Sequence, residues 1–370
     1  MTTSLDDFGK LFPALERYTW LNTATVPPGC EPVLRAAREA LEGWERGKFS
    51  WQAWEGEAYA TRELFARLIG VEARTVALMS SVAEAASTVA AALPPGKVVV
   101  GEREFHSNIF PWTALRERGF EVEEVQAEDD VVSTDALIAA VDERTVLVAV
   151  SEVQSSNGYR VDVRRLAEAC RAAGARLFVN LTQSLGALRF DAAEVGADYV
   201  AAHGYKWLLG MRGAAWMHVR EDRLEALRPI APNWHSIRDP YADYYGSEFD
   251  PAPGAGWLDT SIDWMPWIGS RAALELVASL DREQVERHAL ALSAAFRAEV
   301  TARGFEVVRE EVPTQIVSLR VPDPEALVER LRERRVVGAV RGGSLRLGFH
   351  GFNRGEDVET ALDALEASAR

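Results

Sequence analysis

The sequence predicts an α/β protein with a large domain, built on a mostly parallel sheet flanked by helices, and a small α+β C-terminal domain. Short β-branched runs alternate with helical patterns between residues 75 and 219, and this alternation favours a parallel sheet with helices on both faces. An irregular segment rich in Pro, Gly, Asp, Tyr and Trp follows at 229–267. A chain of 370 residues, 48% of them hydrophobic, can bury one large core and one smaller core.

The strands of the large domain are predicted where short runs of apolar and β-branched residues occur. These runs lie at 76–79, 97–101, 121–126, 145–151, 175–180, 198–202 and 214–219. Apolar residues at helical spacing predict helices at 81–93 and 161–174, and Gly174 is a typical helix stop. The C-terminal part predicts helices at 269–280, 283–304, 326–335 and 356–367 and strands at 305–311, 315–321 and 343–349.

We expect residues 1–20 to pack on the small domain, residues 21–265 to form the large domain, and residues 266–370 to form the small domain. The first residues have neither a basic region nor an apolar core, so no signal peptide is expected, and no apolar run is long enough to span a membrane. Two cysteines, Cys30 and Cys170, cannot form a disulfide framework, and Cys170 lies on the apolar face of a helical pattern. A reducing cytoplasm is the expected location.

The formal net charge is −15, from 56 acidic and 41 basic residues. Nucleic acids and anionic membranes are bound by basic surfaces, so this charge argues against either as a partner. We also expect no metal site. A small molecule is therefore the expected partner.

The segment 176–213 places polar side chains just after two predicted strands. They are Asn180, Thr182 and Gln183 after the first strand, and His203, Tyr205 and Lys206 after the second. In open α/β sheets, ligands bind outside the carboxyl ends of the strands. A lone lysine at a strand end is usually solvated, but Lys206 lies between an apolar strand and an apolar Trp-Leu-Leu run. Such surroundings would desolvate the amine, lower its pKa and suit it to Schiff-base chemistry.

Five motifs occur in an order and spacing that together identify a family. They are YTWLNTATVPP at 18–28, MSSVAEAAS at 79–87, EREFHSNIFPW at 102–112, HGYK at 203–206 and GSLRLGFHGFNRGEDVETAL at 343–362. This set resembles fold-type-I pyridoxal-phosphate enzymes of the class V aminotransferase group, which includes cysteine desulfurases, kynureninase and isopenicillin N epimerase-like proteins. The resemblance covers nearly the whole chain. It implies a covalent internal aldimine between pyridoxal 5′-phosphate and Lys206, and a homodimer with shared active sites.

The resemblance also implies roles for the residues around the cofactor. Its phosphate would be held by Ser81, Val82 and Ala83 at a helix N-terminus, by Tyr205 and His203, and by Thr260 or Ser261 reaching from the partner subunit. A helix N-terminus suits an anion because its N–H groups are free. Phe105 would stack on the ring, although a shift of one residue would substitute His106, and Gln183 would bind the phenolic oxygen. Gln154 and Ser155 would reach that oxygen or the substrate.

The substrate would be bound by residues from both ends of the chain. Arg346 falls on the arginine that clamps the α-carboxylate, a task that the planar guanidinium performs with two parallel hydrogen bonds. Asn22 and Thr25 belong to the opening motif, which lies near the substrate in the family. Ser155 completes this set.

Asn180 departs from the family, which almost always has an aspartate at this position. An aspartate keeps the pyridine nitrogen of the cofactor protonated, so the ring can act as an electron sink. An asparagine offers a hydrogen bond without charge, which weakens this sink. Three explanations remain open: a natural change of reaction type, a substitution introduced to inactivate the enzyme, or a protein that has lost catalysis.

The chemistry can be narrowed by subtraction. No cysteine occurs after Cys170, so the mobile nucleophilic cysteine of a cysteine desulfurase is missing, and Asn180 counts against a transaminase. We therefore predict lyase-type action on a modified amino acid, by β-elimination, C–S cleavage or a decarboxylation-linked reaction. An aminotransferase, an epimerase and a cofactor-binding protein without turnover are the alternatives. Aromatic residues of 229–267 indicate either a pocket for a bulky substrate, such as a modified amino acid from secondary metabolism, or a dimer interface.

Overall fold

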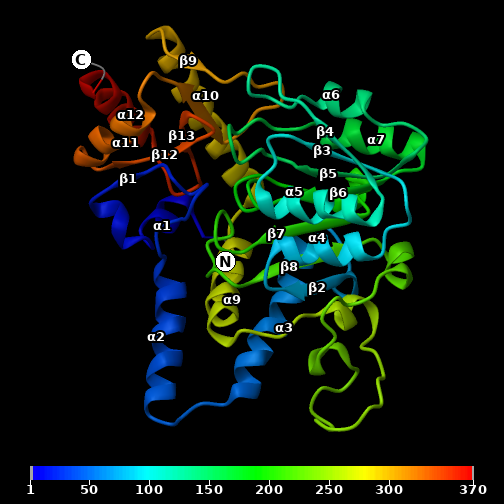
Figure 1. Cartoon of the computed structure of the whole chain (residues 1–370). Coiled ribbons are helices and arrows are strands. Elements are labelled where there is room, and N and C mark those ends of the chain that lie inside the picture. The colour runs from blue at the N-terminus through cyan, green and yellow to red at the C-terminus, as the bar shows by residue number, and fades with distance from the viewer. Residues whose placement is uncertain (1–2, 369–370) are drawn as a thin grey trace.

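A seven-stranded sheet forms the centre of the larger part of the molecule (Figure 1). The computed structural model describes residues 3–368. The strands are β2 (Val76–Met79), β3 (Lys97–Gly101), β4 (Glu121–Val125), β5 (Thr145–Ser151), β6 (Arg176–Asn180), β7 (Tyr199–His203) and β8 (Ala215–Val219). Their order is β2-β8-β7-β6-β5-β3-β4, and β8 runs antiparallel to both of its neighbours while the other pairings are parallel. The predicted strands and the mostly parallel sheet are confirmed.

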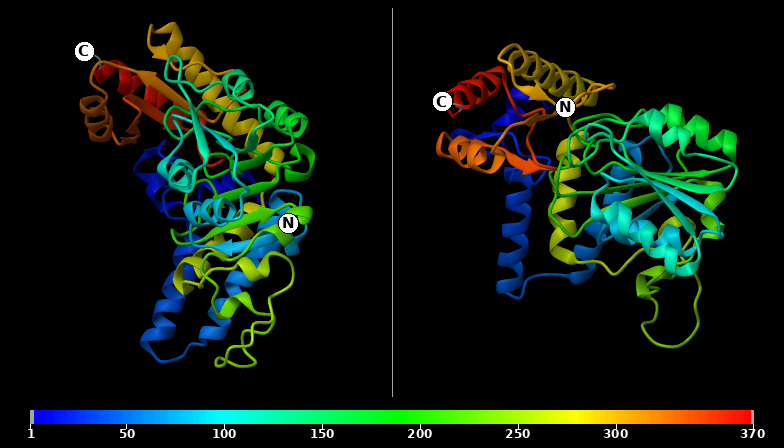
Figure 2. Two further views of the ribbon diagram at one scale, coloured as in Figure 1. Left: turned by 45° about the vertical axis from the view of Figure 1, so that its right-hand side comes forward. Right: turned by 45° about the horizontal axis from the view of Figure 1, so that its top comes forward.

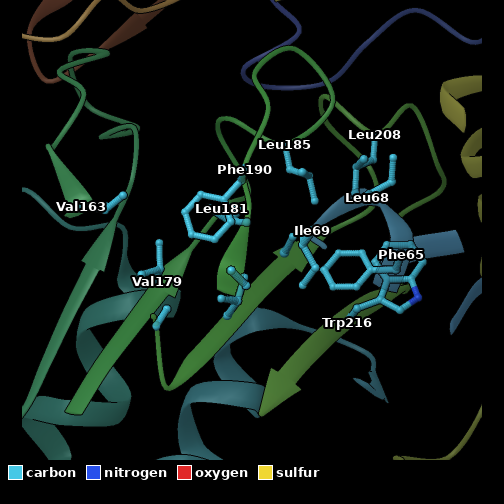
Figure 3. Packing of buried hydrophobic residues seen from close by; sticks show 14 of the residues in the cluster. Phe65, Leu68, Ile69, Val163, Val179, Leu181, Leu185, Phe190, Leu208 and Trp216 are labelled. Carbon is cyan, nitrogen blue, oxygen red and sulfur yellow. The ribbon is translucent and has the colours of Figure 1, made fainter. Parts of the chain in front are cut away.

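Helices cover both faces of this sheet. One face carries α3 (Trp51–Leu68), α6 (Thr134–Ala139), α7 (Val163–Ala173), α8 (Ala192–Val195) and α9 (Trp264–Ala278), and the other carries α4 (Val82–Ala91) and α5 (His106–Thr113). On the first face the ring of Phe65 stacks on Trp216 of β8, with ring centroids 5.1 Å apart (Figure 3). Cys170 is buried there, as its place in the helical pattern predicts, and α7 ends at Gly174 in the left-handed conformation.

The small domain is a four-stranded antiparallel sheet with three helices (Figure 2). Its strand order is β12-β13-β10-β9. The elements are α10 (Arg282–Ala302), β9 (Glu306–Val307), β10 (Ile316–Arg320), α11 (Pro324–Glu333), β12 (Ala339–Arg341), β13 (Ser344–Gly348) and α12 (Gly355–Ser368). The predicted pattern is confirmed except that β12, and the short β11 (Val336–Val337) before it, were not predicted. Two or three residues are too few to show a strand periodicity.

The N-terminal segment lies against the small domain. It contains α1 (Leu5–Gly9) and β1 (Thr19–Trp20), and β1 pairs in parallel with β11. The ring of Phe12 lies 4.6 Å from that of Phe352, centroid to centroid. Residues 1 and 2, the start of the segment 1–20, lie outside the described residues.

The predicted boundary between the two domains, at residues 265 and 266, lies at the start of a helix. Helix α9 begins at Trp264 and packs against α3 and α2 (Glu31–Glu45). The domain limits 21–265 and 266–370 stay a prediction. The segment 229–267 is irregular, as expected, and projects from the large domain as a loop (Figure 2). Six 3-10 helices complete the described elements: Pro13–Glu16, Ala73–Thr75, Ala114–Arg118, Glu221–Ala226, Trp234–Ser236 and Gly254–Leu258. Across residues 3–368, every helix is too short or too polar to cross a membrane.

Candidate active site

The candidate residues gather beyond the carboxyl ends of five strands of the large sheet. Ser81 follows β2, Phe105 follows β3, Ser155 follows β5, Asn180 ends β6, and Lys206 follows β7. The small domain adds Arg346 from β13, and the segment after β1 adds Asn22 and Thr25. This is the edge of an α/β sheet at which ligands bind.

Lys206 has the environment that its sequence context predicts. Its side chain is 7% exposed, and its amine lies 5.6 Å from the ring centroids of both Phe105 and Tyr205. Burial lowers the pKa of Lys206 to about 7, helped by the positive charges of Arg346, Arg341 and Arg212. A large share of the amine is therefore neutral and nucleophilic near pH 7.

The structure places Phe105, and not His106, next to Lys206. Phe105 is the residue before α5 and is 51% exposed, so one face of its ring is free to be covered by a flat group. His106 instead stacks on Phe110, with ring centroids 4.2 Å apart. Stacking of Phe105 on the cofactor ring stays a prediction.

The N-terminus of α4 faces His203. Ser81 is the capping residue, and its hydroxyl accepts a hydrogen bond from the N–H of Glu84. The N–H of Val82 donates to His203 Nε2 at 3.3 Å. The next N–H, of Ala83, has no partner among residues 3–368. Because Nε2 accepts, the proton of the neutral ring is on Nδ1, and that buried atom has no partner in the described chain. Burial and the charge of Lys206 lower the pKa of His203 to about 3, so the ring is neutral.

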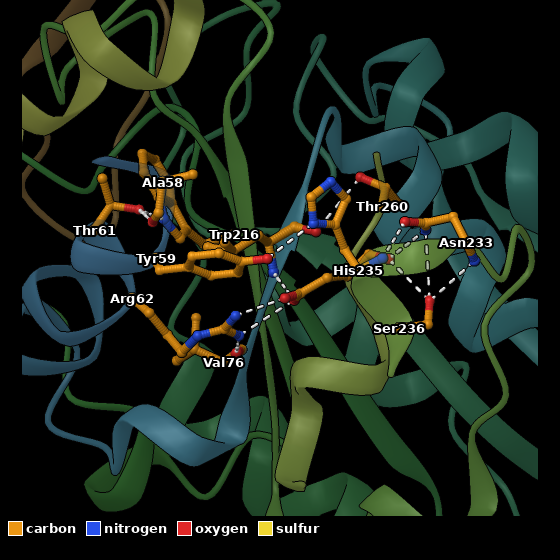
Figure 4. A network of polar contacts seen from close by, with 12 residues as sticks. Ala58, Tyr59, Thr61, Arg62, Val76, Trp216, Asn233, His235, Ser236 and Thr260 are labelled. Atoms are coloured by element: carbon orange, nitrogen blue, oxygen red, sulfur yellow. Dashed lines mark hydrogen bonds and ion pairs between the residues drawn. The ribbon is translucent and has the colours of Figure 1, made fainter. Parts of the chain in front are cut away.

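Thr260 and Ser261 are the two candidates for the contact with the partner subunit's phosphate, and they differ in exposure. The hydroxyl of Thr260 donates to the carbonyl of Leu78 and is buried, whereas Ser261 is exposed. The preceding Asp259 forms a buried ion pair with Arg62, at 2.6 Å, within the polar network of Figure 4. This network holds the end of the irregular segment against α3.

The amide of Asn180 is oriented by two partners. Its Oδ1 accepts from the N–H of Thr182 at 3.0 Å, and its Nδ2 donates to Ser151 Oγ at 3.1 Å. Ser151 Oγ in turn donates to the buried carboxylate of Glu104 at 2.5 Å. A backbone N–H can only donate, so the oxygen of Asn180 must face Thr182, and the remaining free N–H belongs to Nδ2.

Gln183 and Gln154 are engaged within the protein. Gln183 Nε2 donates to the carbonyl of Ala24 and to Ser155 Oγ, and its Oε1 accepts from Trp207 Nε1. To contact a cofactor oxygen, Gln183 Nε2 must therefore give up one of its two hydrogen bonds. The bond to Ser155 Oγ, at 3.2 Å, is the longer of the two. Gln154 Nε2 donates to Val132 O at 2.8 Å.

Arg346 is buried and has no carboxylate within 4.0 Å among the described residues. Its Nη1 donates to the carbonyl of Ser155, its Nη2 donates to Thr25 Oγ1 at 2.9 Å, and its Nε has no partner there. Burial and the nearby Arg341 lower the pKa of Arg346 to about 9. Asn22 Oδ1 is also buried without a partner.

These donors fit pyridoxal phosphate together with an amino-acid carboxylate. His203 Nδ1, the Ala83 N–H and Arg346 Nε are buried or capping donors without partners, and the charges acting on Lys206 are all positive. An anion would satisfy both the free donors and the excess charge. The residues expected from the sequence are thus brought together.

Sequence reasoning missed four residues of the site: Ser151, Glu104, Arg341 and Arg212. Ser151 of β5 contacts Asn180 of the neighbouring strand β6, and Glu104 is linked to Asn180 through Ser151, an arrangement that no local pattern reveals. Arg341 lies beside two glycines that form the turn between β12 and β13, and this turn is the one signal that could have marked it.

The chain matches known proteins over most of its length. The sequence model of the aminotransferase class-V family matches residues 30–359. The uncharacterized aminotransferase YcbU of Bacillus subtilis (strain 168) is 28% identical over 98% of this chain and 97% of its own. The isopenicillin N epimerase of Streptomyces clavuligerus is 28% identical over 86% of this chain and 84% of its own.

A solved structure shows the same fold. The cystine C-S lyase C-DES, in complex with its reaction product cysteine persulfide, superposes with a TM-score of 0.85 at 21% identity, covering 96% of this chain and 98% of the other. The expected fold class is confirmed. The chain belongs to the class V aminotransferase family and is a pyridoxal-phosphate-dependent enzyme of fold type I.

Proposed function

We propose that this enzyme is a lyase that cleaves the C–S bond, or a comparable bond at Cβ, of a modified amino acid. The observation that carries this proposal is the amide at position 180. Asn180 Oδ1 and Nδ2 are held by Thr182 and Ser151, so a hydrogen bond without charge replaces the usual carboxylate. Elimination of a good leaving group tolerates a weak electron sink better than transamination does, and a C–S lyase shares this fold.

Pyridoxal phosphate supplies an aldehyde that binds amines and a ring that withdraws electrons from the substrate Cα. The residues assigned to hold it are Ser81, Val82, Ala83, His203 and Tyr205 at the phosphate, Phe105 over the ring, and Asn180 at the ring nitrogen. Gln183 is assigned to the phenolic oxygen. Lys206 provides the amine that binds the aldehyde.

Arg346 binds the α-carboxylate and thereby fixes the orientation of Cα. Its bonds to Ser155 and Thr25 hold the guanidinium in place before substrate arrives, and its unpartnered Nε is free to donate to the carboxylate. Once the substrate's amine has replaced it on the aldehyde, the neutral amine of Lys206 would be free to take the α-proton. As the Cα–H electrons form a Cα=Cβ double bond, the Cβ–S bond breaks and its electron pair leaves as a thiolate. Hydrolysis of the resulting 2-aminoacrylate gives pyruvate and ammonia.

A persulfide-forming desulfurase mechanism does not fit the cysteines. Burial raises the pKa of Cys30, and burial raises that of Cys170 to about 12, so neither thiol is a ready nucleophile. Both are free, which fits a cytoplasmic location. Elimination requires no protein thiol.

The active site is proposed to be shared within a homodimer. Ser261 is exposed and free to reach a second subunit, whereas Thr260 is tied to Leu78. Exposed aromatic rings, among them Tyr244 and Tyr245, lie on the nearby irregular segment. We assign the contact with the partner's phosphate to Ser261.

A panel of thioether and disulfide amino acids tests the proposal. We expect release of pyruvate and thiol in equal amounts from at least one substrate, and no release by Lys206→Ala. Amination of a supplied keto acid without pyruvate would favour an aminotransferase. Exchange of the α-hydrogen in deuterated water with loss of optical activity would favour an epimerase. Spectral binding without any of these reactions would indicate a protein that has lost turnover.

A further inference from the structure

Two arginines of the small domain converge on Thr25. Arg346 Nη2 donates to Thr25 Oγ1 at 2.9 Å, and Arg341 Nη2 donates to the same oxygen at 3.4 Å. The two lie on the adjacent strands of the β12–β13 hairpin, Arg341 opposite Ser344 and Arg346 opposite Ala339. In the turn between these strands, Gly342 and Gly343 have φ of 56° and 78°. A Cβ on Gly342 would be 3.3 Å from the carbonyl of Ser156, so this turn lies against the loop after β5.

Neither arginine has an acidic partner. Within residues 3–368 no carboxylate lies within 4.0 Å of Arg341 or Arg346, although many surface arginines of this chain form ion pairs. Arg341 also lowers the pKa of both Arg346 and Lys206 through its charge. Two guanidinium groups on one hydroxyl repel each other, and an anion between or beside them would remove that cost.

One α-carboxylate does not balance this charge. Arg346 is buried at the inner end of the pair, and a single carboxylate neutralises it. Arg341 is exposed at the outer end and shares Thr25 Oγ1 with Arg346, so it lies next to the α-carboxylate site. The charge of Arg341 is therefore available to bind a second anionic group.

We propose that the substrate carries a second carboxylate on its side chain, and that Arg341 binds it while Arg346 binds the α-carboxylate. This inference rests on the proposed function, because it takes Arg346 as the α-carboxylate site. It narrows the substrate class to amino acids with an acidic side chain, such as S-carboxyalkyl cysteines. Arg341 then determines specificity, and Thr25 positions both arginines.

Binding of unreactive acids to the holoenzyme tests this without turnover. Glutarate and butyrate are matched probes with two carboxylates and one, and titration calorimetry measures their dissociation constants. We expect glutarate to bind about 10-fold to 100-fold more tightly than butyrate, because it gains one charge-assisted contact. Arg341→Gln should abolish this preference and leave butyrate unchanged.

Two further variants complete the test. Arg330→Gln removes another exposed arginine of the small domain, one that forms no ion pair within residues 3–368, and should leave the preference intact. Arg346→Gln should weaken both acids. Equal binding of the two acids by the unaltered enzyme would overturn the inference, as would an equal loss of both in Arg341→Gln. A glutarate preference in an enzyme without lyase activity would reject the proposed function and keep the second carboxylate.

Discussion

His350 Nε2 donates a hydrogen bond to the backbone carbonyl of Trp207 at 2.9 Å. The N–H of Gly351 donates to His350 Nδ1 at 2.7 Å, so both ring nitrogens of the neutral imidazole are satisfied and the tautomer is fixed. Trp207 follows Lys206 in the chain, and its ring stacks on that of His350. His350 thus joins the small domain to the segment that carries the candidate catalytic lysine.

This arrangement predicts acid sensitivity. Burial lowers the pKa of His350 to about 4, while an unfolded histidine titrates near 6.5. The unfolded chain therefore takes up a proton as the pH falls through 6.5, and the folded chain does not until about 4. The stabilising contribution of neutral His350 is complete above pH 6.5 and is lost between 6.5 and 4.

The measurement is the free energy of unfolding by urea for the unaltered protein and His350→Gln. We expect the difference between them to shrink by about 2 kcal/mol from pH 7 to pH 4.5. His106→Gln alters an exposed histidine and should leave the pH dependence unchanged. Parallel curves for the unaltered protein and His350→Gln would mean that His350 takes up its proton at the same pH in the folded and unfolded chains.

Lys206 is predicted to capture the cofactor in preference to the other lysines, Lys10, Lys48 and Lys97. Its pKa of about 7 means that its neutral fraction rises as the pH rises through 7, and only the neutral amine attacks an aldehyde. Incubation of cofactor-free protein with pyridoxal phosphate, borohydride reduction and peptide mass spectrometry measures this. We expect one label, on Lys206, with a capture rate that increases through pH 7. Lys206→Arg should carry none, and labelling of Lys48 instead would reject the site.

The sequence predicts the large sheet well because most of its strands are buried on both faces; the edge strand β4 is the exception. Runs such as 98–100 and 146–150 are apolar throughout, and the turns between them are well marked. The hairpin that carries Arg341 was missed because β12 has three residues and draws its order from pairing with β13. Short strands depend on tertiary contacts more than on local pattern.

The candidate site was predicted unevenly for a related reason. The positions of the strand ends and the spacing of the motifs pointed to Lys206, Asn180 and His203, because each lies at or just after the end of a strand that the sequence predicts. The partners of these residues come from elsewhere in the chain: Ser151 from β5, Glu104 before α5 and Val82 from α4. Only the folded arrangement shows that Gln183 is already bonded to Ala24 and Trp207.

His203 is predicted to bind the cofactor phosphate through Nδ1–H as a neutral donor. Its pKa of about 3 keeps it uncharged from pH 5 to 8, so its contribution should not vary over that range. His203→Ala should weaken binding of pyridoxal phosphate about 10-fold and leave pyridoxal, which lacks the phosphate, unchanged. Equilibrium dialysis of the cofactor-free protein gives both constants. Equal weakening of the two ligands would show that His203 only shapes the pocket.

Asn180→Asp is predicted to destabilise the cofactor-free protein. Glu104 is a buried carboxyl group that accepts from Ser151 and Asn108, and Ser151 Oγ links it to position 180. Burial raises the pKa of Glu104, and a second acidic group beside it would add to that cost. A second carboxylate at that position would share one hydroxyl with Glu104 at low dielectric. We expect a loss of about 2 to 4 kcal/mol in unfolding free energy at pH 7. The loss should diminish as the pH falls, because the new carboxyl group has a raised folded pKa and protonation relieves the repulsion.

The double variant Asn180→Asp, Glu104→Gln separates charge from packing, because glutamine keeps the shape of Glu104 and removes its charge. We expect it to regain most of the stability, and no recovery would mean that the loss comes from packing. In the loaded enzyme the same carboxylate would hold a protonated ring nitrogen, so Asn180→Asp should raise transamination and leave elimination unchanged. Rates of keto-acid amination and of pyruvate release, measured on one preparation, decide this. If neither rate changes, the amide at position 180 does not select the reaction.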